Sequence, residues 1–222
     1  MSDAVREAKE QVLQGCGLIS ARGYVLGTSG NISARVPAAA GDLLVITPTT
    51  LPYDEMTADD LVVADMAGNI VEGNRKPSME ISMHRSILLA RPDVRCIVHT
   101  HSKCATAASA MQDVAEVPVI DIETAIYIGG SIPVAPFAPP GSEELARNAA
   151  RALGDRAGIL LESHGAIGVG RTMKEALTAS DIIERNCEMF LLIKAAGEIK
   201  PLPQGPLNDL CAFSREKRGL HS

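Results

Sequence analysis

The sequence predicts a layered α/β domain, and three observations agree on it. Short β-rich runs alternate with segments of helical periodicity along most of the chain. The 222 residues include 46% hydrophobic and 22% charged residues, as in a globular protein rather than a disordered chain. A chain of this length favours one large domain. We expect one domain over residues 1–200 and a C-terminal tail or extension over 201–222.

Hydrophobic periodicity predicts the elements of the first half of the chain. Apolar side chains such as Val5, Ala8 and Val12 recur at helical spacing near the N-terminus. Pro77 suits the first turn of a helix, and Pro92 ends that helix. The expected elements are a helix over 4–22, strands over 32–36 and 43–46, a hairpin of 61–66 and 69–72, and a helix over 77–91.

The second half continues the alternation. Thr172 and Glu175 form a capping box before a long amphipathic pattern. The segment 117–141 is rich in Pro and Gly and holds short strand-like pieces, and the residues after 200 resemble an irregular extension. The other expected elements are strands over 94–98, 157–161 and 166–169, and helices over 102–110, from 142 onward and over 172–196.

Composition excludes several classes of function. With 21 Lys and Arg against 27 Asp and Glu, the net charge is −6, which disfavours binding to nucleic acid. No apolar run is long enough for a membrane helix, and the charged first ten residues differ from a signal peptide. The five cysteines are scattered without a CxxC motif, so we expect reduced thiols and a cytoplasmic location.

The histidines give the first chemical signal. His99 and His101 are two residues apart at the end of an apolar strand, so both imidazoles face one side. His164 follows another apolar strand, and two strand ends meeting at one sheet edge would bring the three rings together. Three protein ligands and one open position are typical of a catalytic zinc site. Two hydrogen-bonded histidines near a surface turn are the structural alternative, and Cys104 is a weaker candidate ligand.

A carboxylate and three loops give two further signals. Glu80 precedes His84 by four residues on one helical face, and it is either a general acid–base or a carboxylate favoured at a helix start. Loops rich in Gly, Ser and Thr can hold a phosphate with backbone N–H groups and hydroxyls. Each loop alone also fits an ordinary turn. The three loops are 27–31, 47–50 and 76–78.

These motifs together resemble the class II aldolase and adducin-head family, in pattern most of all its L-fuculose-phosphate aldolases. The similarity covers residues 5–197. It rests on five motifs in the family's order, which are Gly27-Thr28-Ser29-Gly30-Asn31-Ile32-Ser33, Ile46-Thr47-Pro48-Thr49, Lys76-Pro77-Ser78-Met79-Glu80 with His84, Val98-His99-Thr100-His101 and Glu162-Ser163-His164-Gly165.

The resemblance implies a three-layer α/β/α domain around a mixed central sheet and a homotetramer with its sites at subunit interfaces. It implies Zn²⁺, with Mn²⁺, Co²⁺ or Fe²⁺ as alternatives, bound by His99, His101 and His164, and Glu80 as the acid–base residue. It also implies a phosphate pocket, formed by Thr28, Gly30, Asn31, Thr49 and Ser78.

The implied reaction is the cleavage of a ketose phosphate to dihydroxyacetone phosphate and a small aldehyde through a metal-stabilised enediolate. Three departures from the family pattern keep alternatives open. Met79 replaces a serine, Thr50 replaces a glycine, and no tyrosine lies in the tail, which leaves Tyr127 as a candidate interface acid. The alternatives are a metal-dependent decarboxylase or other lyase with a non-sugar or non-phosphorylated substrate, and a non-catalytic binding module like adducin heads.

Overall fold

The computed structural model describes residues 2–220 and contains one mixed sheet between two layers of helices. The strands are β1 (Asn31–Val36), β2 (Leu43–Ile46), β3 (Val62–Asp65), β4 (Ile70–Glu72), β5 (Cys96–Thr100), β6 (Glu116–Val117), β7 (Ile132–Ala135), β8 (Gly158–Leu161) and β9 (Gly165–Gly170). The helices are α1 (Asp3–Ala21), α2 (Ile81–Ala90), α3 (Lys103–Ser109), α4 (Ile122–Ile128), α5 (Glu143–Leu153), α6 (Met173–Ala196) and α7 (Gln204–Lys217), with a short 3₁₀ turn at Ala58–Asp60.

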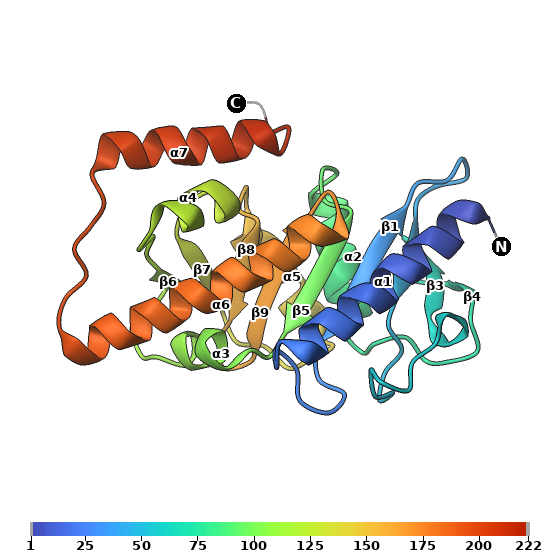
Figure 1. Ribbon diagram of the computed structural model, residues 1–222. Helices are drawn as coiled ribbons and strands as arrows, with labels where there is room; N and C mark the ends of the chain where they lie inside the picture. Colours follow the sequence, from blue (N-terminus) through green and yellow to red (C-terminus); the bar gives the residue numbers. More distant parts are fainter. Residues whose placement is uncertain (1, 221–222) are drawn as a thin grey trace.

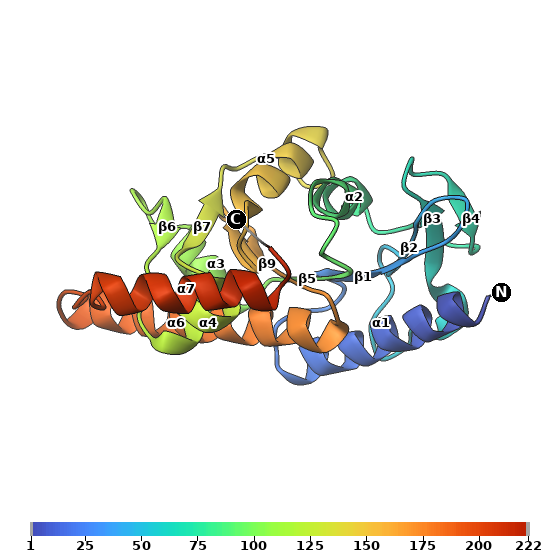
Figure 2. The same ribbon diagram turned by 90° about the horizontal axis from the view of Figure 1, so that it is seen from above.

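The strand order is β4-β3-β2-β1-β5-β9-β8-β7-β6, and β7 with β8 is the parallel pair among the antiparallel ones. Figure 1 shows α1 and α6 crossing one face of this sheet. Figure 2 shows α2 and α5 on the opposite face. The predicted three-layer α/β/α architecture around a mixed sheet is therefore confirmed.

Alternation along the strands decides what faces each helix layer. Cys96 and Val98 of β5 belong to the core under α1, whereas Ile97 belongs to the core that contains α2. The same alternation in β1 directs Ile32 and Ala34 toward α1. The odd-numbered residues of β5 therefore point toward the α2 side of the sheet. His99 is one of them, and it lies beside Glu80 at the N-terminal end of α2.

Most of the predicted elements are confirmed within a few residues. The helix expected from Pro77 begins at Ile81 instead, because Pro77 is engaged in a bridge with Pro48 and the Ser78 N–H donates to the Thr47 carbonyl. The strand expected over 94–98 runs over Cys96–Thr100. No helix among the described residues is long and apolar enough to cross a membrane.

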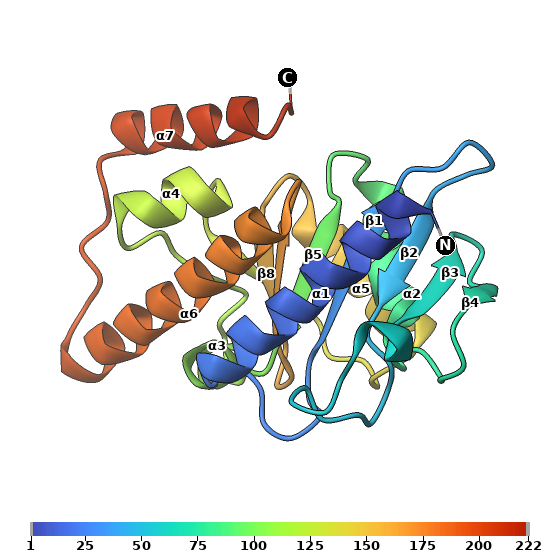
Figure 3. The same ribbon diagram turned by 45° about the vertical axis from the view of Figure 1, so that its right-hand side comes forward.

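Two segments contain a helix that the sequence did not predict, and the strand-like pieces expected within 117–141 include β7. The segment 117–141 contains α4, although its β-branched residues have low helix propensity, because Asp121 caps it and α6 and α7 pack on it. The chain after Pro203 forms α7 instead of an irregular extension. Figure 3 shows α7 lying over α4, away from the sheet. The division into a domain over 1–200 and an extension over 201–222 stays a prediction.

The contact between α6 and β9 leaves no room for a side chain at Gly168. A Cβ there would lie 2.5 Å from the Ser180 Oγ and 2.7 Å from the Ala176 carbonyl oxygen. We expect Gly168→Ala to lower the free energy of unfolding by about 1–3 kcal/mol through overpacking. Gly17 of α1 is the control, because a Cβ there meets nothing within 4 Å, and Gly17→Ala should raise stability by about 1 kcal/mol. Urea unfolding measures both, and a neutral Gly168→Ala would contradict the packing.

Candidate metal centre

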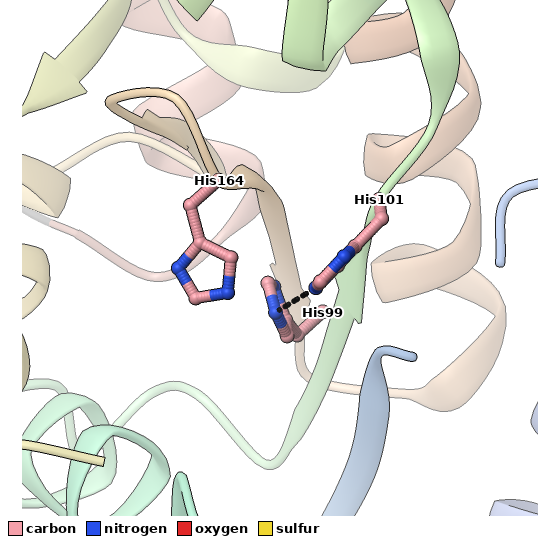
Figure 4. A group of neighbouring side chains, drawn as sticks. All are labelled: His99, His101 and His164. Carbon is pink, nitrogen blue, oxygen red and sulfur yellow. Dashed lines mark hydrogen bonds between the residues drawn. The ribbon is translucent and has the colours of Figure 1, made fainter. Parts of the chain in front are cut away.

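The three predicted histidine ligands meet at one edge of the sheet, as Figure 4 shows. His99 lies in β5, His101 follows the last residue of that strand, and His164 lies in the turn between β8 and β9. β5 and β9 pair antiparallel, with Thr100 opposite Ala166. The end of one strand therefore lies beside the start of the other, and residues far apart in sequence become neighbours.

The three imidazoles surround a common point. One ligand nitrogen from each ring lies within 4.8 Å of the others, and the ring centroids are 4.9–5.0 Å apart. The Nε2 atoms of His99 and His101 are 3.0 Å apart. Cys104 does not belong to this group. Cys104 lies at the start of α3, where its backbone N–H donates to the carboxylate of Glu184 in α6.

Backbone contacts fix the orientation of His99. Its Nδ1 lies 3.0 Å from the Ala166 carbonyl oxygen, so Nδ1 carries the proton and Nε2 is left to bind. A side chain at Gly165 would collide with the Thr100 carbonyl, so glycine is needed for this close approach of β5 and β9. The backbone N–H of His101 donates to the Tyr24 carbonyl, which also fixes this end of β5.

Burial favours neutral imidazoles at two of the three positions. It lowers the pKa of His101 to about 3 and that of His164 to about 4, and the charge of His99 adds to both shifts. Burial also disfavours the charged form of His99, but the neighbouring Glu80 outweighs it and raises the pKa of that ring. The site therefore holds free nitrogen lone pairs and a carboxylate that favours a cation beside them.

Glu80 lies against the histidines, where the sequence predicts an acid–base residue. It is the N-terminal cap residue of α2 and only 4% exposed. Its Oε2 lies 3.1 Å from His99 Nε2, and its Oε1 lies 3.4 Å from His164 Nε2. Burial raises the pKa of Glu80, but His99, Asn31 and His164 outweigh that effect and hold the pKa below its usual range.

The donor set fits a divalent cation. Three imidazole nitrogens converge, a carboxylate adjoins two of them, and Glu80 Oε1 is buried without a hydrogen-bond partner. Buried polar atoms are normally satisfied, so this orphan oxygen indicates a group that completes the site. Nitrogen ligands from histidine suit zinc and other first-row transition metals.

Asn31, one of the residues predicted for phosphate binding, contacts the Glu80 carboxylate through its side chain. Its Nδ2 donates to Glu80 Oε2 at 2.8 Å, and its Oδ1 lies 2.5 Å from His84 Nε2. His84 Nδ1 lies 2.6 Å from Ser33 Oγ. Burial lowers the pKa of His84 to about 3, with a further contribution from His99. Ser33 ends the first sequence motif, but sequence analysis assigned it no role, although its spacing of two from Asn31 on one strand indicates a shared face.

The three hydroxyl-rich loops adjoin the histidines. The Thr49 N–H donates to the Lys76 carbonyl, and the Ser78 Oγ accepts from the Glu80 N–H, so the second and third loops pair beside Glu80. Gly30, with a φ of +74°, lies against the His99 carbonyl oxygen. Thr28 lies in an exposed turn before it. The loops are thus adjacent, and their binding of phosphate stays a prediction.

Tyr127 lies apart from the histidines of its own chain. It is on α4 and lines a cavity of about 360 Å³ with Val169 and Gly170, at the end of β9 remote from His164. The Lys217 ammonium lies 5.4 Å from the centre of its ring. A role for Tyr127 at the site of a neighbouring subunit stays a prediction.

Comparisons with known proteins agree with this geometry. Residues 10–191 match the family described as Class II Aldolase and Adducin N-terminal domain. A 5-deoxy-D-ribulose 1-phosphate aldolase of Bacillus thuringiensis is 33% identical over 92% of this chain and 93% of its own. A 5-methylthioribulose-1-phosphate/5-deoxyribulose-1-phosphate aldolase of Rhodospirillum rubrum is 35% identical over 83% of this chain and 80% of its own. A solved L-fuculose 1-phosphate aldolase has a TM-score of 0.87 at 29% identity over 96% of both chains.

We expect His99→Ala to lose most of a bound divalent ion, because two imidazoles hold such an ion weakly. Metal analysis of the purified variant, reconstituted beside the wild type, measures the loss. Cys104→Ser is the matched control and should keep its metal, since Cys104 lies outside the ligand group. Full occupancy in folded His99→Ala would remove His99 from the ligand set.

Proposed function

This chain belongs to the class II aldolase and adducin family, and from that premise we propose that it cleaves a ketose 1-phosphate to dihydroxyacetone phosphate and a small aldehyde. The chain is a metal-dependent class II aldolase, a carbon–carbon lyase. The substrate proposal follows the named activities of its relatives, which are aldolases of 5-deoxyribulose, 5-methylthioribulose and fuculose phosphates.

One observation carries the proposal. The buried Glu80 carboxylate lies 3.1 Å from His99 Nε2 and 3.4 Å from His164 Nε2, and the second and third hydroxyl-rich loops pair beside it. We propose that His99, His101 and His164 hold Zn²⁺, with Mn²⁺, Co²⁺ or Fe²⁺ as alternatives. A divalent ion bound there would supply Lewis acidity toward the oxygens next to the bond that breaks.

Glu80 is suited to proton transfer beside this centre. Cleavage leaves an electron pair on the carbon next to the ketone, and that carbon needs a proton to give dihydroxyacetone phosphate. Oε2 of Glu80 is held by Asn31, whereas Oε1 is free of hydrogen bonds. In cleavage, the hydroxyl that becomes the aldehyde releases one proton, which balances the one that this carbon gains. We propose that Oε1 delivers the proton to the carbon in cleavage and removes it in condensation.

We propose that the phosphate lies against the loops that contain Thr28, Gly30, Asn31, Thr49 and Ser78. Backbone N–H groups and hydroxyls of such loops offer several donors to an anion. Met79 is 63% exposed beside Ser78, so this chain places a flexible apolar side chain where the family pattern has a hydroxyl. A homotetramer and a cytoplasmic location stay predictions, the latter in keeping with five free cysteines.

The first test is proton exchange in dihydroxyacetone phosphate dissolved in heavy water. We expect the zinc-loaded enzyme to exchange one hydroxymethyl proton, as seen by proton NMR, and a chelator to abolish the exchange until zinc is restored. Exchange needs no aldehyde, so it tests the ketose half alone. Absence of exchange from metal-loaded wild type would contradict the proposal and direct attention to carboxylated substrates and decarboxylation.

We expect Glu80→Gln to keep its metal but lose proton transfer, because an amide of the same shape cannot act as a base. The exchange rate should fall at least about a hundredfold, within the usual contribution of general acid–base catalysis. Metal content measured on the same sample separates this effect from a damaged ligand set. Near-normal exchange would remove Glu80 from the proposed role.

A further inference from the structure

A chain of buried polar contacts leads from Glu80 into the protein interior, and the proposed chemistry does not use its far end. It passes from Glu80 Oε2 to Asn31, from Asn31 to His84 and from His84 to Ser33. The distances are 2.8, 2.5 and 2.6 Å. His84 and Ser33 are fully buried, and Asn31 is 4% exposed. His84 is therefore not a group that binds substrate from solvent.

One arrangement of hydrogens satisfies the whole chain. The Glu80 carboxylate can only accept, so the amide nitrogen of Asn31 must face it. This turns the Asn31 Oδ1 toward His84, whose Nε2 must then carry a proton and donate. Nδ1 of the neutral ring is left as an acceptor, and the Ser33 hydroxyl supplies the hydrogen it needs. With the other tautomer of His84, two acceptors would face each other at Asn31.

The elements explain why these groups meet. Asn31 and Ser33 are two residues apart on β1, so both point to the α2 side of the sheet. Glu80 and His84 are one turn apart at the start of α2, so both can reach the Asn31 amide. A strand and a helix end thus contribute alternate links of one chain.

We propose that His84, held in a single tautomer by Ser33, is a positioning residue that fixes the Asn31 amide and thereby aims the Glu80 carboxylate. This inference rests on the proposed function for the role of Glu80. With Oε2 anchored by Asn31, the carboxylate cannot rotate, and Oε1 keeps its place beside His164. A small misplacement of a proton-transfer group costs about a hundredfold in rate. The effect should therefore appear in turnover and not in metal binding.

Three variants separate positioning from simple support of the fold. His84→Leu fills similar space but leaves the Asn31 Oδ1 without a donor. His84→Gln retains an N–H that can reach Asn31. Ser33→Ala keeps the ring but removes the group that selects its tautomer. Ser180→Ala is the matched control, because its buried hydroxyl bonds only to the Ala176 carbonyl of its own helix.

Zinc-loaded samples are compared for metal content, proton exchange per bound zinc, and the split between kcat and KM for dihydroxyacetone phosphate. We expect losses in exchange of about a hundredfold in His84→Leu and about tenfold in Ser33→Ala, with metal content and KM unchanged. His84→Gln should recover much of the loss, and Ser180→Ala should match the wild type. Unchanged exchange per zinc in His84→Leu would overturn the proposal, as would a loss that His84→Gln does not relieve.

A second readout does not depend on activity. Long-range proton–nitrogen NMR of the zinc-loaded wild type should show His84 protonated at Nε2 and bare at Nδ1, with a mixture of tautomers in Ser33→Ala. A ring protonated at Nδ1 in the wild type, or a tautomer unaffected by Ser33→Ala, would overturn the inference. If the wild type fails to exchange, the proposed function fails, while the tautomer measurement still decides whether Ser33 fixes His84.

Discussion

The antiparallel pairing of β5 with β9 is the interaction on which the site depends. It sets Thr100 opposite Ala166, so the end of one strand lies beside the turn that precedes the other. That turn holds His164, and the facing strand end holds His99 and His101. The same pairing brings the Ala166 carbonyl to His99 Nδ1 and so selects the nitrogen that can bind a metal. Gly165 permits the approach because it has no side chain to hold the strands apart.

The second requirement is a helix that begins at this edge. α2 starts one residue after Glu80, so a buried carboxylate lies against two imidazoles. Burial lowers the pKa values of His101 and His164, whereas the neighbouring His99, Asn31 and His164 hold the pKa of Glu80 low against the effect of burial. The pocket is buried, and its one negative group makes a single extra positive charge favourable. A divalent ion satisfies that demand while the imidazoles stay neutral.

Local patterns were enough to predict that His99, His101 and His164 meet and to predict most of the fold. The spacing of two between His99 and His101 fixes their common side, and the capping box at Thr172 and Glu175 marks the start of α6. Other features depend on contacts between distant segments. α4 forms despite weak helix propensity because α6 and α7 cover it, and the helix after Pro77 starts late because that segment pairs with Thr47 and Pro48. The link from Asn31 to Glu80 also needed the folded structure, since the residues lie in different elements.

The position of His164 in the turn between β8 and β9 also affects the conformational entropy of the segment between His101 and His164. From His101 to His164 the chain makes a long excursion through α3, β6, α4, β7, α5 and β8. An ion held by both residues would join the two ends of this excursion, as a covalent crosslink would. Ordering a long loop costs conformational entropy, and a ligand that binds only the closed form offsets that cost. The ion would thus act as a reversible crosslink that stabilises the closed form of the segment between His101 and His164.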